Sequence, residues 1–163
     1  MKFIALGSNL NSARGGPAQN IHAAAVELKA QGFQIIARAP LYQSAAEPPS
    51  DQADFINTVL QAEWGGTPEE ALARCMEVEA AMGRVRGVRN EARIIDIDII
   101  AWDGAVQSGS PELPHPRMQD RAFVLWPLCD IAPDWRHPVL GRSALELKNA
   151  LTPSDIHLNG EQW

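Results

Sequence analysis

The chain has 163 residues, 45% of them hydrophobic and 21% charged, which suits one domain over residues 1–163 with a sizeable core. Its formal net charge is −6 and its isoelectric point is near 5.1. Nucleic acids and anionic membranes are bound by basic surfaces, so this balance argues against both as general partners.

The sequence also indicates where the protein resides. The N-terminal apolar run, residues 3–6, is too short for the core of a signal peptide, and no stretch approaches the ~20 apolar residues of a membrane-spanning helix. The two cysteines, Cys75 and Cys129, lack the C-x-x-C spacing of a zinc site, and Cys75 is expected to be a buried free thiol. We therefore predict a cytoplasmic protein.

The chain begins with a strand and a helix. Residues 2–6 have the apolar run of a short buried strand, which the sequence GSN at residues 7–9 ends. That triplet lacks the glycines and the lysine of a phosphate loop, so we expect it to be structural. A helix is predicted from Pro17, since proline suits the first helical position, and Gly32 is expected to end it.

Two further strands enclose a loop. Residues 33–42 are rich in Ile and Ala, and residues 55–64 alternate between apolar and polar side chains, so both segments are predicted to be strands. Residues 44–51 between them contain a proline pair and no periodicity, which predicts a loop.

A second helix has a strong start signal. Thr67 can cap it, Pro68 can occupy its first position, and Glu70 can complete a capping box, while Gly83 is placed to end it. With the strand that follows, the order of elements is β-α-β-β-α-β, which is typical of the ferredoxin-like α+β fold. This fold has an antiparallel sheet with two helices on one face, so we expect the other face to be available for a ligand.

Residues 83–100 are the most informative stretch. Isoleucines surround Asp96 and Asp98, and because successive strand side chains point to opposite faces, the two aspartates share one face. Two carboxylates ~6.6–7 Å apart can bind a hard cation together. Four arginines precede them: Arg84, Arg86, Arg89 and Arg93. In an acidic chain this arrangement suits a metal-bound phosphate, although a solvated edge strand beside a solvated loop is the alternative.

The C-terminal part is expected to be an extension of this core. Residues 118–128 are a short helical candidate that Pro127 should interrupt. A final helix is predicted after a Ser143 cap, with Leu145, Leu147 and Leu151 on its apolar side, followed by a loose end.

Five motifs then make residues 3–135 resemble a known family. They are ALGSNL at residues 5–10, Tyr42 before the proline loop, DFIN at residues 54–57, GRVR with RIIDIDII after it, and LPHPRMQDRAFVLWPL at residues 113–128. Together they resemble the 6-hydroxymethyl-7,8-dihydropterin pyrophosphokinase family of folate biosynthesis. This family has a ferredoxin-like fold, in agreement with the order of elements above.

The resemblance implies a pyrophosphokinase that transfers pyrophosphate from ATP to the hydroxymethyl oxygen of the pterin and releases AMP. It implies that Asp96 and Asp98 hold two Mg²⁺ ions against the triphosphate, and that Arg84 and Arg93 are catalytic and close over the phosphates. The residues expected to contact ATP are Glu79, Arg84, His115 and Arg121.

The resemblance also implies a pterin site, with the pterin and ATP as the partners of the protein. The residues expected to bind the pterin are Ser44, Ala45, Phe55, Asn57 and Phe123. Two aromatic faces can sandwich a flat ring, and Asn57 offers donors and an acceptor to its edge.

The sequence departs from the family at several positions. Asn90 stands where the family often has a tryptophan, which removes an aromatic cover over the pterin, and Glu91 adds negative charge near ATP. The arginine loop is about one residue shorter. The sequence SAAE at residues 44–47 replaces the more usual threonine, proline and leucine, and Phe55 lacks the hydroxyl of a tyrosine. These differences concern the loops and leave the aspartate pair intact.

Two other functions remain open at this point. A metal-dependent phosphohydrolase would use the same aspartates and arginines without a pterin acceptor. A non-catalytic ferredoxin-like binding module would need no metal. RNA binding by the same fold is disfavoured, because the strands lack paired aromatic and basic motifs and the net charge has the wrong sign.

Overall fold

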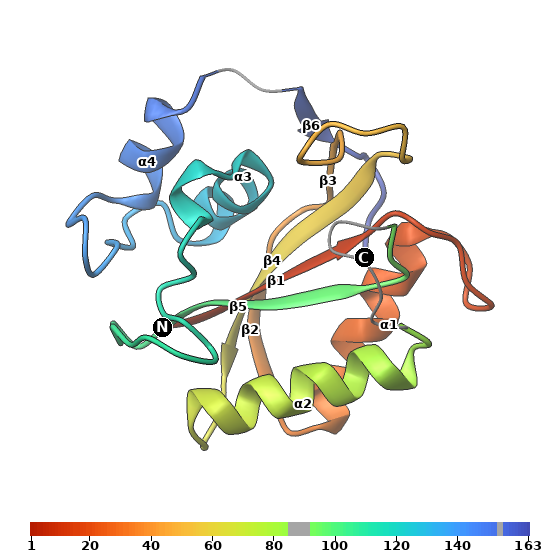
Figure 1. The fold of residues 1–163 in the computed structure, drawn as a ribbon, viewed down its shortest axis with the longest axis horizontal. Helices are drawn as coiled ribbons and strands as arrows, with labels where there is room; N and C mark the ends of the chain where they lie inside the picture. The colour runs from red at the N-terminus through yellow and green to blue at the C-terminus, as the bar shows by residue number, and fades with distance from the viewer. Residues whose placement is uncertain (85–91, 153–154) are drawn as a thin grey trace.

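The structure is a computed structural model that describes residues 1–84, 92–152 and 155–163. A six-stranded antiparallel sheet with strand order β5-β1-β4-β3-β6 crosses the described part of the molecule, and β2 pairs with the end of β4 that β3 leaves free (Figure 1). The strands are β1 (Lys2–Ser8), β2 (Gln34–Arg38), β3 (Tyr42–Ser44), β4 (Phe55–Glu63), β5 (Asp96–Trp102) and β6 (Ile156–Leu158). The antiparallel sheet confirms the predicted class of fold.

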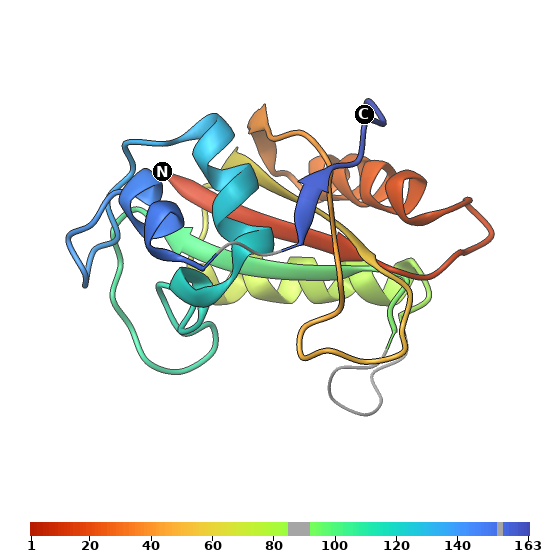
Figure 2. The same ribbon diagram turned by 90° about the horizontal axis from the view of Figure 1, so that it is seen from above.

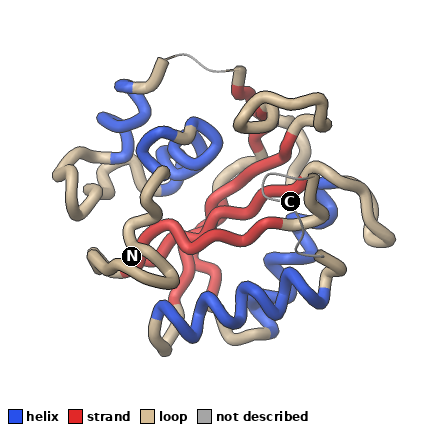
Figure 3. Tube along the Cα trace, in the orientation of Figure 1, coloured by secondary structure: helices blue, strands red, loops and turns tan. Residues whose placement is uncertain are grey.

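Helices lie on both faces of this sheet (Figures 1 and 3). One face carries α1 (Pro17–Ala30) and α2 (Pro68–Ala81), and the other carries α3 (Ala122–Ile131) and α4 (Ala144–Ala150). Each pair encloses its own core, and the view from above shows α3 and α4 gathered at one end of the sheet (Figure 2). None of these described helices is both long and apolar enough to cross a membrane.

The predicted helix starts are confirmed. Pro17 occupies the first turn of α1. Thr67 accepts a hydrogen bond from the Glu70 amide and closes a capping box at α2, and Ser143 does the same with Glu146 at α4. Local side-chain chemistry therefore sets these boundaries, as the sequence indicates.

The predicted strand over residues 33–42 is divided. Residues 34–38 form β2 and residues 42–44 form β3, and both pair with β4. Pro40 stands between them, and because proline has no amide hydrogen it cannot continue a ladder. Ser44, predicted to begin the loop, is the last residue of β3, which places its side chain beside β4.

The prediction that Pro127 interrupts a helix at residues 118–128 is wrong. A short 3₁₀ turn, η1 (Met118–Asp120), comes first, and α3 then runs through Pro127. The proline costs one helical hydrogen bond, but α3 buries Val124, Leu125 and Leu128 against the sheet, and this burial outweighs the loss.

Two expectations about the C-terminal part are also wrong. The end of the chain is not loose, since β6 pairs with β3. Leu145 is 45% exposed and does not lie on the buried side of α4, although Leu147 is buried as predicted.

The sheet face opposite α1 and α2 is not fully open either, because α3 and α4 cover the end that contains Phe3 and Val59. The ligand space is limited to the other end of that face.

Both cysteines are buried and free, as expected for Cys75. Burial raises the pKa of the Cys75 thiol to about 12, with a smaller contribution from Glu79, so this thiol is inert at neutral pH.

Candidate active site

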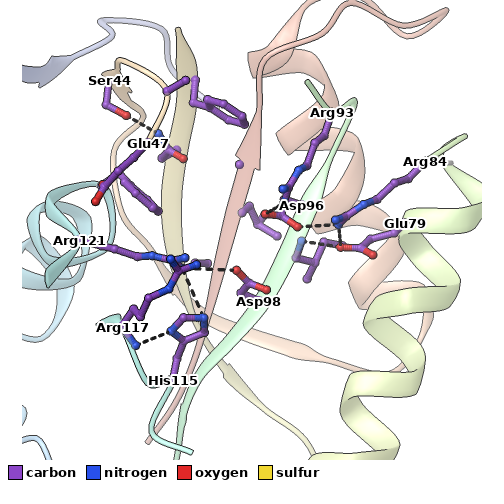
Figure 4. A pocket seen from close by; sticks show the side chains of 18 of the residues that line it. Ser44, Glu47, Glu79, Arg84, Arg93, Asp96, Asp98, His115, Arg117 and Arg121 are labelled. Atoms are coloured by element: carbon purple, nitrogen blue, oxygen red, sulfur yellow. Dashed lines mark hydrogen bonds and ion pairs between the residues drawn. The ribbon is translucent and has the colours of Figure 1, made fainter. Parts of the chain in front are cut away.

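A cavity of about 850 Å³ opens where α3 and α4 leave the sheet uncovered. It lies over the second half of β1 and the first halves of β4 and β5, which antiparallel pairing brings to the same end of the sheet. All of the predicted site residues line it: Ser44, Ala45, Phe55, Asn57, Glu79, Arg84, Arg93, Asp96, Asp98, His115, Arg121 and Phe123. Residues far apart in the sequence thus meet in one space (Figure 4).

The two aspartates of β5 face this cavity, as predicted. Ile97 and Ile99 point the other way and are 3% exposed, so the strand is held firmly against the first core. The Asp98 carboxylate is 42% exposed. Burial, followed by the nearby charge of Asp96, raises the pKa of Asp98 to about 6. The nearby arginines therefore do not offset the effects of burial and of Asp96 on the Asp98 carboxylate.

On one wall, arginines engage Asp96. Arg84 donates to Asp96 Oδ1 at 2.6 Å and to Glu79 Oε1, while Arg93 donates to Asp96 Oδ2 at 2.5 Å. Glu79 is 3% exposed and also accepts from the Ile97 amide at 2.8 Å, which ties α2 to β5. Burial lowers the pKa of Arg84, but Asp96 and Glu79 outweigh it and raise the pKa above its ordinary value.

The opposite wall carries His115, Arg117 and Arg121 (Figure 4). His115 is anchored by its amide, which donates to Ile100 O at 2.8 Å. Burial, then Arg121 and Arg117, lower the pKa of His115 to about 4, so the ring is neutral at pH 7. Its Nδ1 accepts from the Arg117 amide at 3.2 Å, and its Nε2 lies 3.4 Å from Arg121 Nη1. Arg121 Nη1 also lies 4.0 Å from Asp98 Oδ2, so the guanidinium presents donors to the cavity beside the imidazole.

A flat, partly apolar compartment adjoins these charges. Asn57 Nδ2 donates to Ser44 Oγ at 3.0 Å. Gly7 leaves room for the amide, because a Cβ at that position would meet Asn57 Oδ1 at 3.0 Å. Phe55 and Phe123 are only half-buried and line the cavity, and Phe123 also packs against the second core. This combination of one amide and two aromatic rings suits a flat heterocycle.

Some lining residues were missed by the sequence analysis. Leu72 and Met76 precede Glu79 by seven and three residues, so they share its face of α2, and this spacing was a usable signal. Glu47 and Arg117 also line the cavity. Neither has a local signal beyond its charge, because only the packing of distant segments brings it to the site.

The expected structural role of residues 7–9 is confirmed. The hydroxyl of Ser8 donates to Ile94 O at 2.5 Å, and Asn9 accepts from the Arg93 amide at 2.8 Å. The triplet therefore holds the segment that leads into β5. The predicted contributions of Arg86, Arg89, Asn90 and Glu91 lie outside the described residues.

The carboxylate pair fits a hard divalent cation. Asp96 and Asp98 present oxygens on one face, and Mg²⁺ in such sites takes one or two carboxylates together with phosphate oxygens and water. Among residues 1–84, 92–152 and 155–163, no three His, Cys, Asp or Glu side chains are grouped so that they could hold a metal ion.

The chain matches one known protein family over most of its length. Residues 3–133 match the model of 7,8-dihydro-6-hydroxymethylpterin-pyrophosphokinase. A 2-amino-4-hydroxy-6-hydroxymethyldihydropteridine pyrophosphokinase of Methylorubrum extorquens is 37% identical over 156 residues, which cover 94% of this chain and 95% of that protein. The protein of the same name from Pseudomonas aeruginosa is 39% identical over 140 residues, 83% of each chain.

Longer proteins contain a similar segment. A folic acid synthesis protein of Dictyostelium discoideum is 38% identical over 157 residues, which are 95% of this chain and 23% of that protein. A crystal structure of the HPPK-DHPS protein of Plasmodium falciparum, a triple mutant, superposes with a TM-score of 0.68 at 15% identity, over 91% of this chain and 43% of that chain. At this identity the superposition shows the fold.

Proposed function

Since the chain belongs to the 7,8-dihydro-6-hydroxymethylpterin-pyrophosphokinase family, we propose that it transfers the pyrophosphoryl group of ATP to the hydroxymethyl oxygen of 6-hydroxymethyl-7,8-dihydropterin and releases AMP, a step of folate biosynthesis. One observation carries the proposal: a single cavity joins a carboxylate pair and arginines to an amide–aromatic compartment. We propose the cytoplasm as its compartment, where buried thiols stay reduced.

Asp96 and Asp98 would hold the metal, for which we propose two Mg²⁺ ions. When bound, Mg²⁺ supplies charge neutralisation on the phosphates. The carboxylates orient the triphosphate over β5, and the rigid isoleucine face beneath them keeps that orientation. Phosphoryl transfer is catalysed mainly by such positioning and by electrostatic stabilisation.

Arginines on both walls would contact the phosphates. Arg84 and Arg93 already lie against Asp96, at the distances of charged hydrogen bonds, and a guanidinium can exchange a carboxylate oxygen for a phosphate oxygen. Arg121 and the His115 ring would bind from the opposite wall. A triphosphate chain between the walls would thus be surrounded by donors that stabilise developing negative charge.

The pterin would occupy the compartment at Asn57. Its ring edge would exchange hydrogen bonds with the Asn57 amide and the Ser44 hydroxyl, while Phe55 and Phe123 cover its faces and Ala45 lies at the rim. A pterin bound there with its hydroxymethyl group towards the aspartate pair would have the orientation that the transfer requires.

Substitutions in this compartment should weaken pterin binding selectively. We expect Asn57→Ala to raise the Kd for the pterin about tenfold or more, because an unpaired polar ring edge costs ~1–3 kcal/mol. We expect Phe123→Ala to raise it about threefold to tenfold, because a lost stacking face costs ~0.5–1.5 kcal/mol. The Kd for ATP should change less than threefold, by roughly 0.6 kcal/mol or less. Isothermal calorimetry with each ligand measures both, and equal losses for the two ligands would contradict the assignment.

The proposed activity has a simple test. Purified protein is incubated with ATP and Mg²⁺, with and without the pterin, and AMP is measured. Release of AMP that requires the pterin supports the proposal, whereas ATP breakdown without pterin indicates the phosphohydrolase and an inert mixture indicates a binding module.

A further inference from the structure

Asn9 lies between the two halves of the site, outside the lining of the cavity. It directly follows β1 and is 4% exposed. The carboxamide has an oxygen that accepts hydrogen bonds and an NH₂ group that can donate two, and both groups are hydrogen-bonded. The oxygen accepts from the Arg93 amide at 2.8 Å, and the nitrogen donates to Ala53 O at 3.1 Å and to Gln52 Oε1 at 3.2 Å. One buried side chain therefore connects two segments that are 40 residues apart.

The oxygen side of this connection fixes Arg93. The amides of Asn9 and Leu10 both donate to Arg93 O, at 3.1 and 3.2 Å, so the peptide groups on both sides of Arg93 are held. With its backbone fixed, Arg93 reaches Asp96 Oδ2 at 2.5 Å. The direction of this guanidinium is thus set by the residues that follow β1 as well as by the segment that leads into β5.

The nitrogen side fixes the segment that leads into β4. Residues 52 and 53 stand just before Phe55 and Asn57, and the loop that they end carries the cavity residues 45–48. The Asn9 nitrogen donates to both Gln52 and Ala53, so its loss would remove two hydrogen bonds that hold this segment and would let it move. The compartment proposed for the pterin depends on its position.

We propose that Asn9 is a positioning residue with two separable roles: its oxygen aims Arg93 at the phosphates, and its nitrogen holds the loop that encloses the pterin. This inference rests on the proposed function for the names of the ligands. The geometry predicts that aspartate at this position keeps the first role and loses the second, because a carboxylate accepts hydrogen bonds but donates none.

The test compares Asn9→Asp and Asn9→Ala by kinetics and by hydrogen exchange of the Arg93 amide. For Asn9→Asp we expect parental protection of that amide, a kcat within about threefold of the parent, and a KM for the pterin raised about tenfold. For Asn9→Ala we expect protection of the Arg93 amide to fall by about tenfold, with kcat falling about tenfold as well.

Asn20 offers a matched control. It is also a buried asparagine of this region, and it donates to Ser8 Oγ and Leu10 O. Its side chain makes no hydrogen bond to Arg93 or to residues 52 and 53 among those of the described residues. Asn20→Ala should lower the melting temperature, while kcat, the pterin KM and Arg93 protection stay near parental. The inference is overturned if Asn9→Asp loses kcat and Arg93 protection as Asn9→Ala does, or if both variants behave like Asn20→Ala.

Two further points keep the result decisive. If Asn9→Ala does not fold, Asn9→Ser replaces it, with the same loss of Arg93 protection expected. If the parent makes no pyrophosphorylated pterin, the proposed function fails, but amide exchange at Arg93 still decides whether Asn9 fixes this arginine.

Discussion

Replacing Asp98 by asparagine is expected to abolish pyrophosphoryl transfer and, at pH 7.5, to make the folded protein more stable. Turnover should fall at least ~1000-fold, because a lost metal ligand removes charge stabilisation worth several kcal/mol. Stability should rise because the carboxylate is ionised in a partly buried place beside Asp96, and the amide has no charge to desolvate.

The gain in stability should depend on pH with a definite sign. Burial and Asp96 place the folded pKa of Asp98 at about 6, above its ordinary value of 3.8. The penalty is therefore fully present above pH 6 and disappears as the pH falls towards 3.8, where the carboxyl is protonated whether or not the chain is folded. Since the side chain is 42% exposed, we expect a gain of only about 1 kcal/mol at pH 7.5 and none at pH 3.5.

Asp96→Asn should abolish transfer with the opposite effect on stability. Its carboxylate accepts from both Arg84 and Arg93, whose side chains are 16% and 22% exposed, so its loss leaves two guanidinium groups with weaker partners. We expect a loss of about 1–3 kcal/mol. The two neighbouring aspartates thus contribute to function alike and to folding oppositely.

Urea unfolding of the parent and both variants at pH 7.5 and 3.5, with initial rates from the same preparations, checks this contrast. If Asp98→Asn has a lower free energy of unfolding than the parent at pH 7.5, the contacts of the Asp98 carboxylate stabilise the folded protein, contrary to this prediction. Near-parental turnover in either variant would show that the pair does not hold a metal.

The second large effect concerns Arg84 and Arg93. We expect Arg84→Ala and Arg93→Ala to lower the single-turnover rate about 100-fold or more, while the Kd for ATP changes less than tenfold. Both guanidinium groups are satisfied by carboxylates before the substrate binds, so contacts with the phosphates add most where negative charge develops, in the transition state.

Rapid-quench single-turnover rates and calorimetric ATP affinities measure these effects. Lysine variants serve as controls, because lysine keeps the charge but lacks the planar fork, so only part of the rate should return. If both alanine variants keep near-parental rates and bind ATP weakly, the arginines are ground-state binding residues. The sequence predicts that the loop over residues 85–92 is mobile without ligand, and residues 85–91 of it lie outside the described residues.

The sequence predicted the parts of the site that depend on local patterns. Alternation along one strand placed Asp96 and Asp98 on one face, and the capping box at Thr67 placed Glu79 on a helix against that strand. The resemblance to a family supplied the distant members, such as Asn57 and His115, and the structure brings them to the same cavity.

Features that depend on distant packing were not predictable. Strand β6 exists because residues 156–158 meet the free edge of β3, and no local signal distinguishes them from a loose end. The path of α3 through Pro127 depends on burial against the sheet, which overrides a local helix breaker. Arg117 and Glu47 likewise reach the cavity only because the segments around them pack there.

The proposed transfer is tested most directly by the mass of the pterin product. In a reaction of purified protein with Mg²⁺, 6-hydroxymethyl-7,8-dihydropterin and ATP that carries isotopic label in its β and γ phosphates, we expect a pterin that gains both labelled phosphates together, with one AMP for each product. Asp96→Asn and Asp98→Asn should form none. A pterin that gains a single phosphate, or labelled phosphate released with the pterin unchanged, would contradict it.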